Sequence, residues 1–263
     1  MMPRLTSLPL LFFLLLFSYP LIAQESPHLS GAGTNSPLDR LSFSNTQKWD
    51  RELQKYTQQN PLLLPKNWKQ SVAVPQPPAN SSERTAEELR LLQTLATKRA
   101  ISQAQIEAEV ILPNFPFGQH TYASLTDATQ RPATAKLIKA AFNDSAIVVF
   151  TFKKQFNRVR PSLLAEKLNK PIGTAIAIPE HPAYPSGHAT SSWTIAYLLQ
   201  ELDPNHAVNY RKSAAAITHH REIAGLHYPS DSRAGRLLAR QLMDLMLANP
   251  HFQRQLNEAK KEW

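Results

Sequence analysis

Hydrophobic and polar positions alternate along this chain with the period of helices that bury one face. Apolar residues spaced three and four apart run through residues 190–202, 206–224 and 232–248. The dipeptide Asp203-Pro204 separates the first two stretches, and Pro250 follows the third. We therefore predict three consecutive helices in the C-terminal part of the chain.

Further helices are predicted upstream from local signals. Thr85 and Glu88 stand at the spacing of a capping box, so a helix should begin there. Residues 134–142 have helical spacing, and residues 143–145 (Asn-Asp-Ser) are of the types that break and re-cap a helix. Residues 146–152 have the composition of a strand, but no partner strand is evident, so we interpret them as a buried helix. The predicted fold class is all-α, a helical bundle.

The first 23 residues differ from the rest and predict a signal peptide. Arg4 is the only charged side chain before Glu25, and residues 8–17 form an apolar run. That run is short of the roughly 20 residues a membrane span needs. We expect cleavage after Ala23 rather than an uncleaved anchor, a periplasmic or secreted protein, and no stable membrane insertion afterwards.

The remaining chain divides by composition into three segments. Residues 24–84 are rich in Pro, Ser and Asn and predict a mostly irregular N-terminal arm with one short helix near 46–56. Residues 85–250 carry the helical pattern and are predicted to form the main domain. Residues 251–263 are predicted to be a polar C-terminal tail.

Composition narrows the function classes. The chain has 29 Lys and Arg against 20 Asp and Glu, a formal net charge of +9, which suits anionic partners. The basic residues are spread out, without a Lys/Arg-rich run, so nucleic acid is not expected as a partner. The chain contains no cysteine, which excludes disulfides and thiol chemistry.

Several cations stand at positions that suggest a buried role. Arg221 interrupts the apolar stripe of residues 206–224, where burial is costly unless the side chain is paired. Lys153 and Arg160 are seven residues apart, a spacing that places them on one face of a helix. A structural ion pair for Arg221 is the alternative to ligand binding. For Lys154 and Arg158 we expect a solvated basic face.

Ser186, Gly187 and His188 directly precede the predicted helix at 190–202. A helix N-terminus offers unpaired N–H groups and the positive end of the dipole, which suits an anion. Gly187 allows close approach of the backbone, Ser186 adds a hydroxyl, and His188 has the chemistry to protonate a leaving oxygen. The alternative is an ordinary turn with a surface histidine.

His227 lies four residues before Asp231. A carboxylate at that spacing can accept a hydrogen bond from one ring nitrogen and leave the other nitrogen to attack. The alternative is that Asp231 caps the last helix and His227 is a packed residue. The two roles of Asp231 are compatible.

Taken in order, these residues resemble the three-part signature of the PAP2 (type 2 phosphatidic acid phosphatase) superfamily, which includes soluble bacterial non-specific acid phosphatases and vanadium haloperoxidases. The resemblance covers about residues 85–250. It implies an all-α bundle and a metal-independent phosphatase that hydrolyses phosphate monoesters of small molecules through a phosphohistidine. The implied roles are nucleophile for His227, general acid for His188, orientation of the nucleophile for Asp231, and phosphate binding for Lys153, Arg160, Ser186, Gly187 and Arg221.

One position departs from the family pattern, and other functions stay open. His220 stands where the family usually has Ser before the arginine of the third part. A vanadium-dependent haloperoxidase, with vanadate as its cofactor, or a phosphatase of lipid or isoprenoid phosphates would share the signature. A metal site is a further alternative, without the usual ligand spacing, built from His181, His188, His219, His220 and His227.

Overall fold

The computed structural model describes residues 36–110 and 112–263; the predicted signal peptide lies outside them. These residues confirm the all-α prediction. Their only strands are β1 (Pro116–Phe117) and β2 (His120–Thr121), which have two residues each and pair antiparallel. The helices are α1 (Arg51–Gln54), α2 (Trp68–Ser71), α3 (Glu83–Ala96), α4 (Arg99–Ala108), α5 (Tyr122–Leu125), α6 (Pro132–Phe156), α7 (Pro161–Lys167), α8 (Gly187–Leu202), α9 (Ala207–Ile223), α10 (Pro229–Ala248) and α11 (Pro250–Lys260). None of these described helices is both long and apolar enough to cross a membrane.

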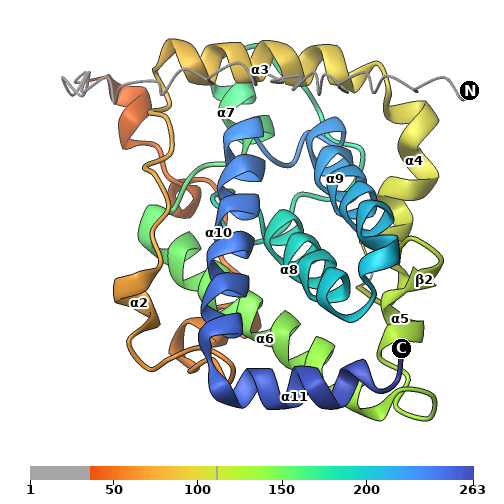
Figure 1. The fold of residues 1–263 in the computed structure, drawn as a ribbon. Helices are drawn as coiled ribbons and strands as arrows, with labels where there is room; N and C mark the ends of the chain where they lie inside the picture. Colours follow the sequence, from red (N-terminus) through yellow and green to blue (C-terminus); the bar gives the residue numbers. More distant parts are fainter. Residues whose placement is uncertain (1–35, 111) are drawn as a thin grey trace, which may run out of the picture. The chain divides into compact units, whose positions relative to one another are not determined.

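Helix α8 forms the centre of the bundle, packed against α6, α9 and α10 (Figure 1). It is buried on nearly all sides, so its polar residues need partners inside the protein. The hydroxyls of Thr190, Ser191 and Thr194 donate to backbone carbonyls four residues earlier in the chain. This pairing lets a helix with several hydroxyl side chains occupy the core.

Helix α6 is continuous, so the break predicted at residues 143–145 is wrong. The Asp144 carboxylate forms its hydrogen bonds outside α6 rather than with the backbone of its own helix. It accepts hydrogen bonds from the N–H groups of Leu62 (2.8 Å) and Leu63 (2.6 Å) in the N-terminal arm. Residues 146–152 lie within this helix, mostly buried, which confirms the choice of helix over strand.

The start of α3 differs from the predicted capping box. Ser82 is the N-cap, and its Oγ accepts from the Thr85 N–H at 3.2 Å. The Thr85 hydroxyl donates to the Ala79 carbonyl at 2.7 Å. Glu88 is buried among arginines rather than at the helix end.

The N-terminal arm is part of the core. Its described portion is largely irregular, and a short helical piece lies near the predicted place, α1 with a 3₁₀ turn at Lys55–Gln58. Leu63, Leu64 and Trp68 are buried in the main apolar cluster, and the described residues from Ser36 to Trp263 belong to one compact unit. The composition change near residue 84 therefore marks no structural boundary.

The C-terminal segment also belongs to the bundle. Residues 251–263, predicted as a polar tail, instead form most of α11, which packs against α6 and α10. Phe252, Leu256 and Ala259 recur at helical spacing and are buried, and the polar residues between them face solvent.

We predict that Asp144→Ala lowers the free energy of unfolding by about 2 kcal/mol, because two arm N–H groups lose their acceptor. Urea unfolding measures the change. Asp244→Ala, which removes an exposed carboxylate paired with Arg240, should cost less than about 0.5 kcal/mol. Equal losses in the two variants would contradict the anchoring role.

Candidate active site

Three chain segments bring the predicted residues together. They are the end of α6 with the loop into α7, the N-terminus of α8, and the stretch from the end of α9 to the start of α10. In Figure 1, α6, α9 and α10 lie around α8.

Lys153 and Arg160 converge by a different route from the one predicted. Helix α6 ends at Phe156, and Asn157 then takes a left-handed conformation (φ 46°), so the two cations do not share a helix face. Lys153 Nζ donates to the carbonyls of Pro182 (2.6 Å) and Ala183 (3.1 Å). Arg160 Nε donates to the carbonyl of the residue just before them, His181, at 3.0 Å. The two cations are fully buried and hold the same loop.

Arg221 is paired on one side only. Its Nη2 donates to Glu109 Oε2 (3.0 Å) and to the Ile106 carbonyl (2.8 Å). Its Nε and Nη1 are buried without a hydrogen-bond partner among the described residues. The alternative of a structural ion pair is therefore correct for half of the guanidinium, and the other half has donors available for a ligand.

Glu109 also contacts His220. Its Nδ1 lies 2.8 Å from Glu109 Oε1, so the histidine that replaces the usual Ser contacts this carboxylate. Glu109 follows α4, is buried, and contacts two residues of α9. No sequence signal identified it, because its role depends on packing between α4 and α9.

The Ser186–His188 segment forms the start of α8. Ser186 is the N-cap, with its Oγ accepting from the Ala189 N–H at 3.3 Å. Gly187 is the first helical residue, and a Cβ there would lie 3.9 Å from Lys153 Cε, so the lysine stem runs beside it. His188 Nε2 lies 3.1 Å from the Glu109 carbonyl, to which it can only donate. Burial, followed by the nearby charge of Arg221, lowers the pKa of His188 to about 3.

The contacts of His227 define its tautomer. Nδ1 lies 3.2 Å from Asp231 Oδ2, and Nε2 lies 3.1 Å from Arg160 Nη1. An ionised carboxylate only accepts and a guanidinium only donates, so the proton is on Nδ1 and the lone pair is on Nε2. Burial, with the charges of Arg160 and Lys153, holds the pKa of His227 well below its usual value. The geometry therefore favours a neutral imidazole with Nε2 as its basic atom.

Asp231 is fixed from its other side by Arg158. Arg158 Nη1 donates to Asp231 Oδ1 (2.6 Å) and to Ser230 Oγ (2.7 Å), and its guanidinium lies 3.8 Å from the Tyr228 ring centre. The prediction that Arg158 belongs to a solvated face is wrong, whereas Lys154 is exposed as predicted. Asp231 Oδ2 also accepts from the Tyr228 N–H at 2.9 Å, so it caps α10 as well.

His181 is a member of the cluster that sequence reasoning did not assign to phosphate chemistry. Its Nδ1 lies 2.9 Å from Arg160 Nη2, and burial with the nearby Lys153 and Arg160 charges depresses its pKa well below the usual value. Among the described residues, no group of three or more His, Asp or Glu side chains is placed to hold a metal ion.

Burial also lowers the pKa of the cations. Desolvation is the largest cause for Lys153, whose pKa falls well below its usual value, and for Arg160, whose pKa falls to about 10. The pKa of Arg221 is lowered for the same reason, partly offset by Glu109. An anion in contact with these cations would favour their charged forms and so raise the lowered pKa values.

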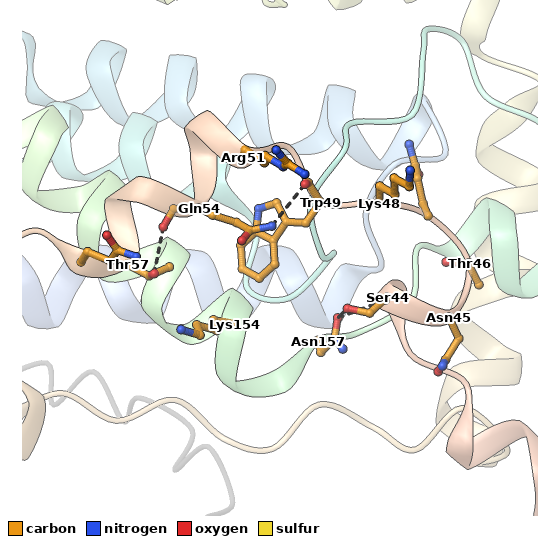
Figure 2. Close-up of a pocket in the computed structure, with 12 residues that line it drawn as sticks. Ser44, Asn45, Thr46, Lys48, Trp49, Arg51, Gln54, Thr57, Lys154 and Asn157 are labelled. Carbon is orange, nitrogen blue, oxygen red and sulfur yellow. Dashed lines mark hydrogen bonds between the residues drawn. The ribbon is translucent and has the colours of Figure 1, made fainter.

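Several cavities lie near these segments. One, of about 200 Å³, adjoins the site and is lined by His181, Gly187 and His188 together with apolar side chains. A larger one, of about 770 Å³, is polar and is formed by arm residues with Lys154 and Asn157 (Figure 2). The larger cavity contains none of the predicted site residues, and the same is true of two other cavities beside α8–α10 and Tyr184, so the 200 Å³ cavity is the relevant pocket.

Residues 135–252 match the family model of the PAP2 superfamily. Over this segment, which is less than half of its length, the chain is similar to the PAP2 superfamily. The match includes every residue predicted for the site but excludes Glu109 and the N-terminal arm.

Curated proteins that are similar in sequence to this chain include two enzymes. An acid phosphatase of Zymomonas mobilis is 32% identical over 142 residues, covering 52% of each chain. A non-specific acid phosphatase of Providencia stuartii is 28% identical over 133 residues, covering 50% of this chain and 54% of that protein. This chain therefore spans about half the length of these relatives.

Two solved structures share the fold of this chain. A bacterial vanadium-dependent iodoperoxidase aligns with a TM-score of 0.61 at 17% identity, covering 82% of this chain and 63% of that chain. A bacterial vanadium-dependent chloroperoxidase aligns with a TM-score of 0.57 at 11% identity, covering 80% and 56%. At these identities the likeness is one of fold.

We predict that stability falls as the pH drops from 7 to 5. His181, His188 and His227 stay uncharged in the folded protein because their pKa values are lowered, whereas in the unfolded chain they take up protons near pH 6.5. Each histidine contributes a loss of up to about 1.4 kcal/mol per pH unit below 6.5. Asp144, whose pKa is raised to about 6, acts in the opposite direction below pH 6. It offsets the loss of stability from about one of the three histidines. Urea unfolding across this range measures the slope, and constant or rising stability would contradict the buried neutral histidines.

Proposed function

We propose that this protein is a metal-independent phosphatase that hydrolyses monophosphate esters of small molecules. The observation that carries the proposal is the pair of contacts on His227, which put its proton toward Asp231 and its lone pair toward Arg160. A neutral, oriented imidazole within a cluster of buried cations is suited to attack phosphorus. The resemblance to acid phosphatases supports the same reaction.

Phosphate binding is assigned to the cations and to the start of α8. Lys153, Arg160 and the unpartnered Nε and Nη1 of Arg221 supply positive charge and donors. Ser186 and the backbone at Gly187 add the N-terminal end of a sixteen-residue helix. These groups would neutralise the charge on the phosphoryl oxygens as it redistributes in the transition state.

The reaction proceeds in two steps. His227 Nε2 attacks phosphorus, the bond from phosphorus to the ester oxygen breaks, and the leaving oxygen takes a proton from His188. Water then attacks the phosphohistidine and loses a proton to His188, and the P–N bond breaks to release inorganic phosphate. His188 is uncharged in the empty site, but a bound phosphate dianion would favour its protonated form.

No metal or other cofactor is needed in this scheme, because the buried cations supply the positive charge. Vanadate resembles the five-coordinate phosphorus of the transition state and should bind the same groups, so vanadate-dependent halide oxidation distinguishes a haloperoxidase from a phosphatase. We further propose that the protein is exported and acts in the periplasm or outside the cell. Its substrates would be small phosphorylated molecules rather than nucleic acid.

We predict that His227→Ala lowers kcat/KM for an aryl phosphate by at least about 10³-fold, because the nucleophile is lost. His219→Ala is the matched control, since His219 is on α9 but about half exposed, and it should retain activity within about twofold. Steady-state assays of both variants, with and without chelator, provide the measurement. Substantial activity in His227→Ala, or loss of wild-type activity with chelator, would overturn the scheme.

A further inference from the structure

The 200 Å³ cavity beside the site has apolar walls drawn from several parts of the chain. Two hydroxyls line it, but they are committed to their own helices: Ser145 Oγ donates to the Phe142 carbonyl (2.7 Å) and Ser191 Oγ to the Gly187 carbonyl (3.0 Å). A hydroxyl that already donates has no second proton to offer a ligand. The apolar lining residues are Leu53, Val110, Leu112, Phe115, Phe142, Ala146, Val149 and Phe150.

Two histidines join this cavity to the reaction centre. The His188 ring lies 5.3 Å from the Phe115 ring, and the His181 ring lies 5.3 Å from the Phe150 ring at 80°. The nitrogens of the same histidines contact the polar cluster, His181 through Arg160 and His188 through the Glu109 carbonyl. The cavity therefore begins where a leaving oxygen protonated by His188 would be.

The size and chemistry of the cavity select the group that fits. An apolar cavity of about 150 Å³ is enough for a benzene ring. A polyol placed here would lose water without finding hydrogen-bond partners on the apolar walls, which costs binding free energy. An aryl or branched alkyl group would instead gain from burial.

We propose that this cavity binds the alcohol portion of the substrate and makes the enzyme selective for monophosphates of small aryl or branched alkyl alcohols. This inference rests on the proposed phosphatase function. It also assigns a role to the N-terminal arm, because Leu53 of α1 supplies one wall. The specificity-determining residues would thus include four from outside the PAP2 match, Leu53, Val110, Leu112 and Phe115.

The test compares benzyl phosphate with 2-hydroxyethyl phosphate, whose leaving alcohols are similar in acidity but differ in polarity. We expect kcat/KM to favour the benzyl ester by about tenfold or more. Ala146→Leu fills the cavity and should lower the benzyl value by about tenfold while the 2-hydroxyethyl value stays within about twofold. Ala140→Leu adds the same bulk to α6 outside the cavity lining and should keep the wild-type preference.

A second cavity variant tests the inference independently of the folding of Ala146→Leu. Leu53→Gln changes a half-buried wall residue of the arm and should also reduce the benzyl preference. A wild-type ratio near one, or an unchanged ratio in both cavity variants, would overturn the inference.

A binding measurement separates this inference from the phosphatase proposal. Calorimetry with benzylphosphonate and methylphosphonate, which are not hydrolysed, measures the affinity of the cavity for the benzyl group without turnover. Tighter binding of the benzyl compound by the wild type, lost in Ala146→Leu, supports the cavity assignment even if neither ester is hydrolysed. Equal affinities for the two phosphonates would overturn it even if phosphatase activity is found.

Discussion

The burial of cations is the constraint on which the site depends. Lys153, Arg160 and Arg221 are all removed from water, at a cost of several kcal/mol each unless compensated. Much of the compensation comes from backbone carbonyls, and Glu109 pairs with one side of Arg221. These contacts fix the loop at 181–183 against the ends of α6 and α9. The Nε and Nη1 donors of Arg221 remain available for an anion, whose charge would favour the charged forms of the buried cations.

The same burial determines the state of the histidine. Positive charge and desolvation keep His227 neutral, and Asp231 fixes which nitrogen carries its proton. Asp231 in turn is held by Arg158 and by the Tyr228 N–H. The proposed nucleophile is therefore positioned by a chain of contacts rather than by one neighbour, and its electrostatic environment disfavours the charged imidazolium until an anion binds.

Sequence patterns were sufficient for most of the helices, because helical periodicity is local, although they missed α11 and the continuity of α6. They were insufficient for partners that tertiary packing selects. Glu109 pairs with Arg221 across 112 residues, and Arg158 pairs with Asp231 across 73. The sequence predicted that a helix breaks near Asp144. In the structure the helix continues, because the Asp144 carboxylate accepts hydrogen bonds from arm N–H groups 81 and 82 residues away. Helical periodicity holds no information about such pairs.

Nitrogen NMR of His227 tests the central claim most directly, with the protein labelled in its histidine side chains. The account predicts an Nδ1–H tautomer with Nε2 unprotonated, and no titration of this residue between pH 8 and pH 5 in the absence of phosphate. Assignment of the signal by comparison with His227→Ala identifies the residue. An Nε2–H tautomer, or titration near the ordinary histidine pKa of about 6.5, would contradict the neutral nucleophile held between Asp231 and Arg160.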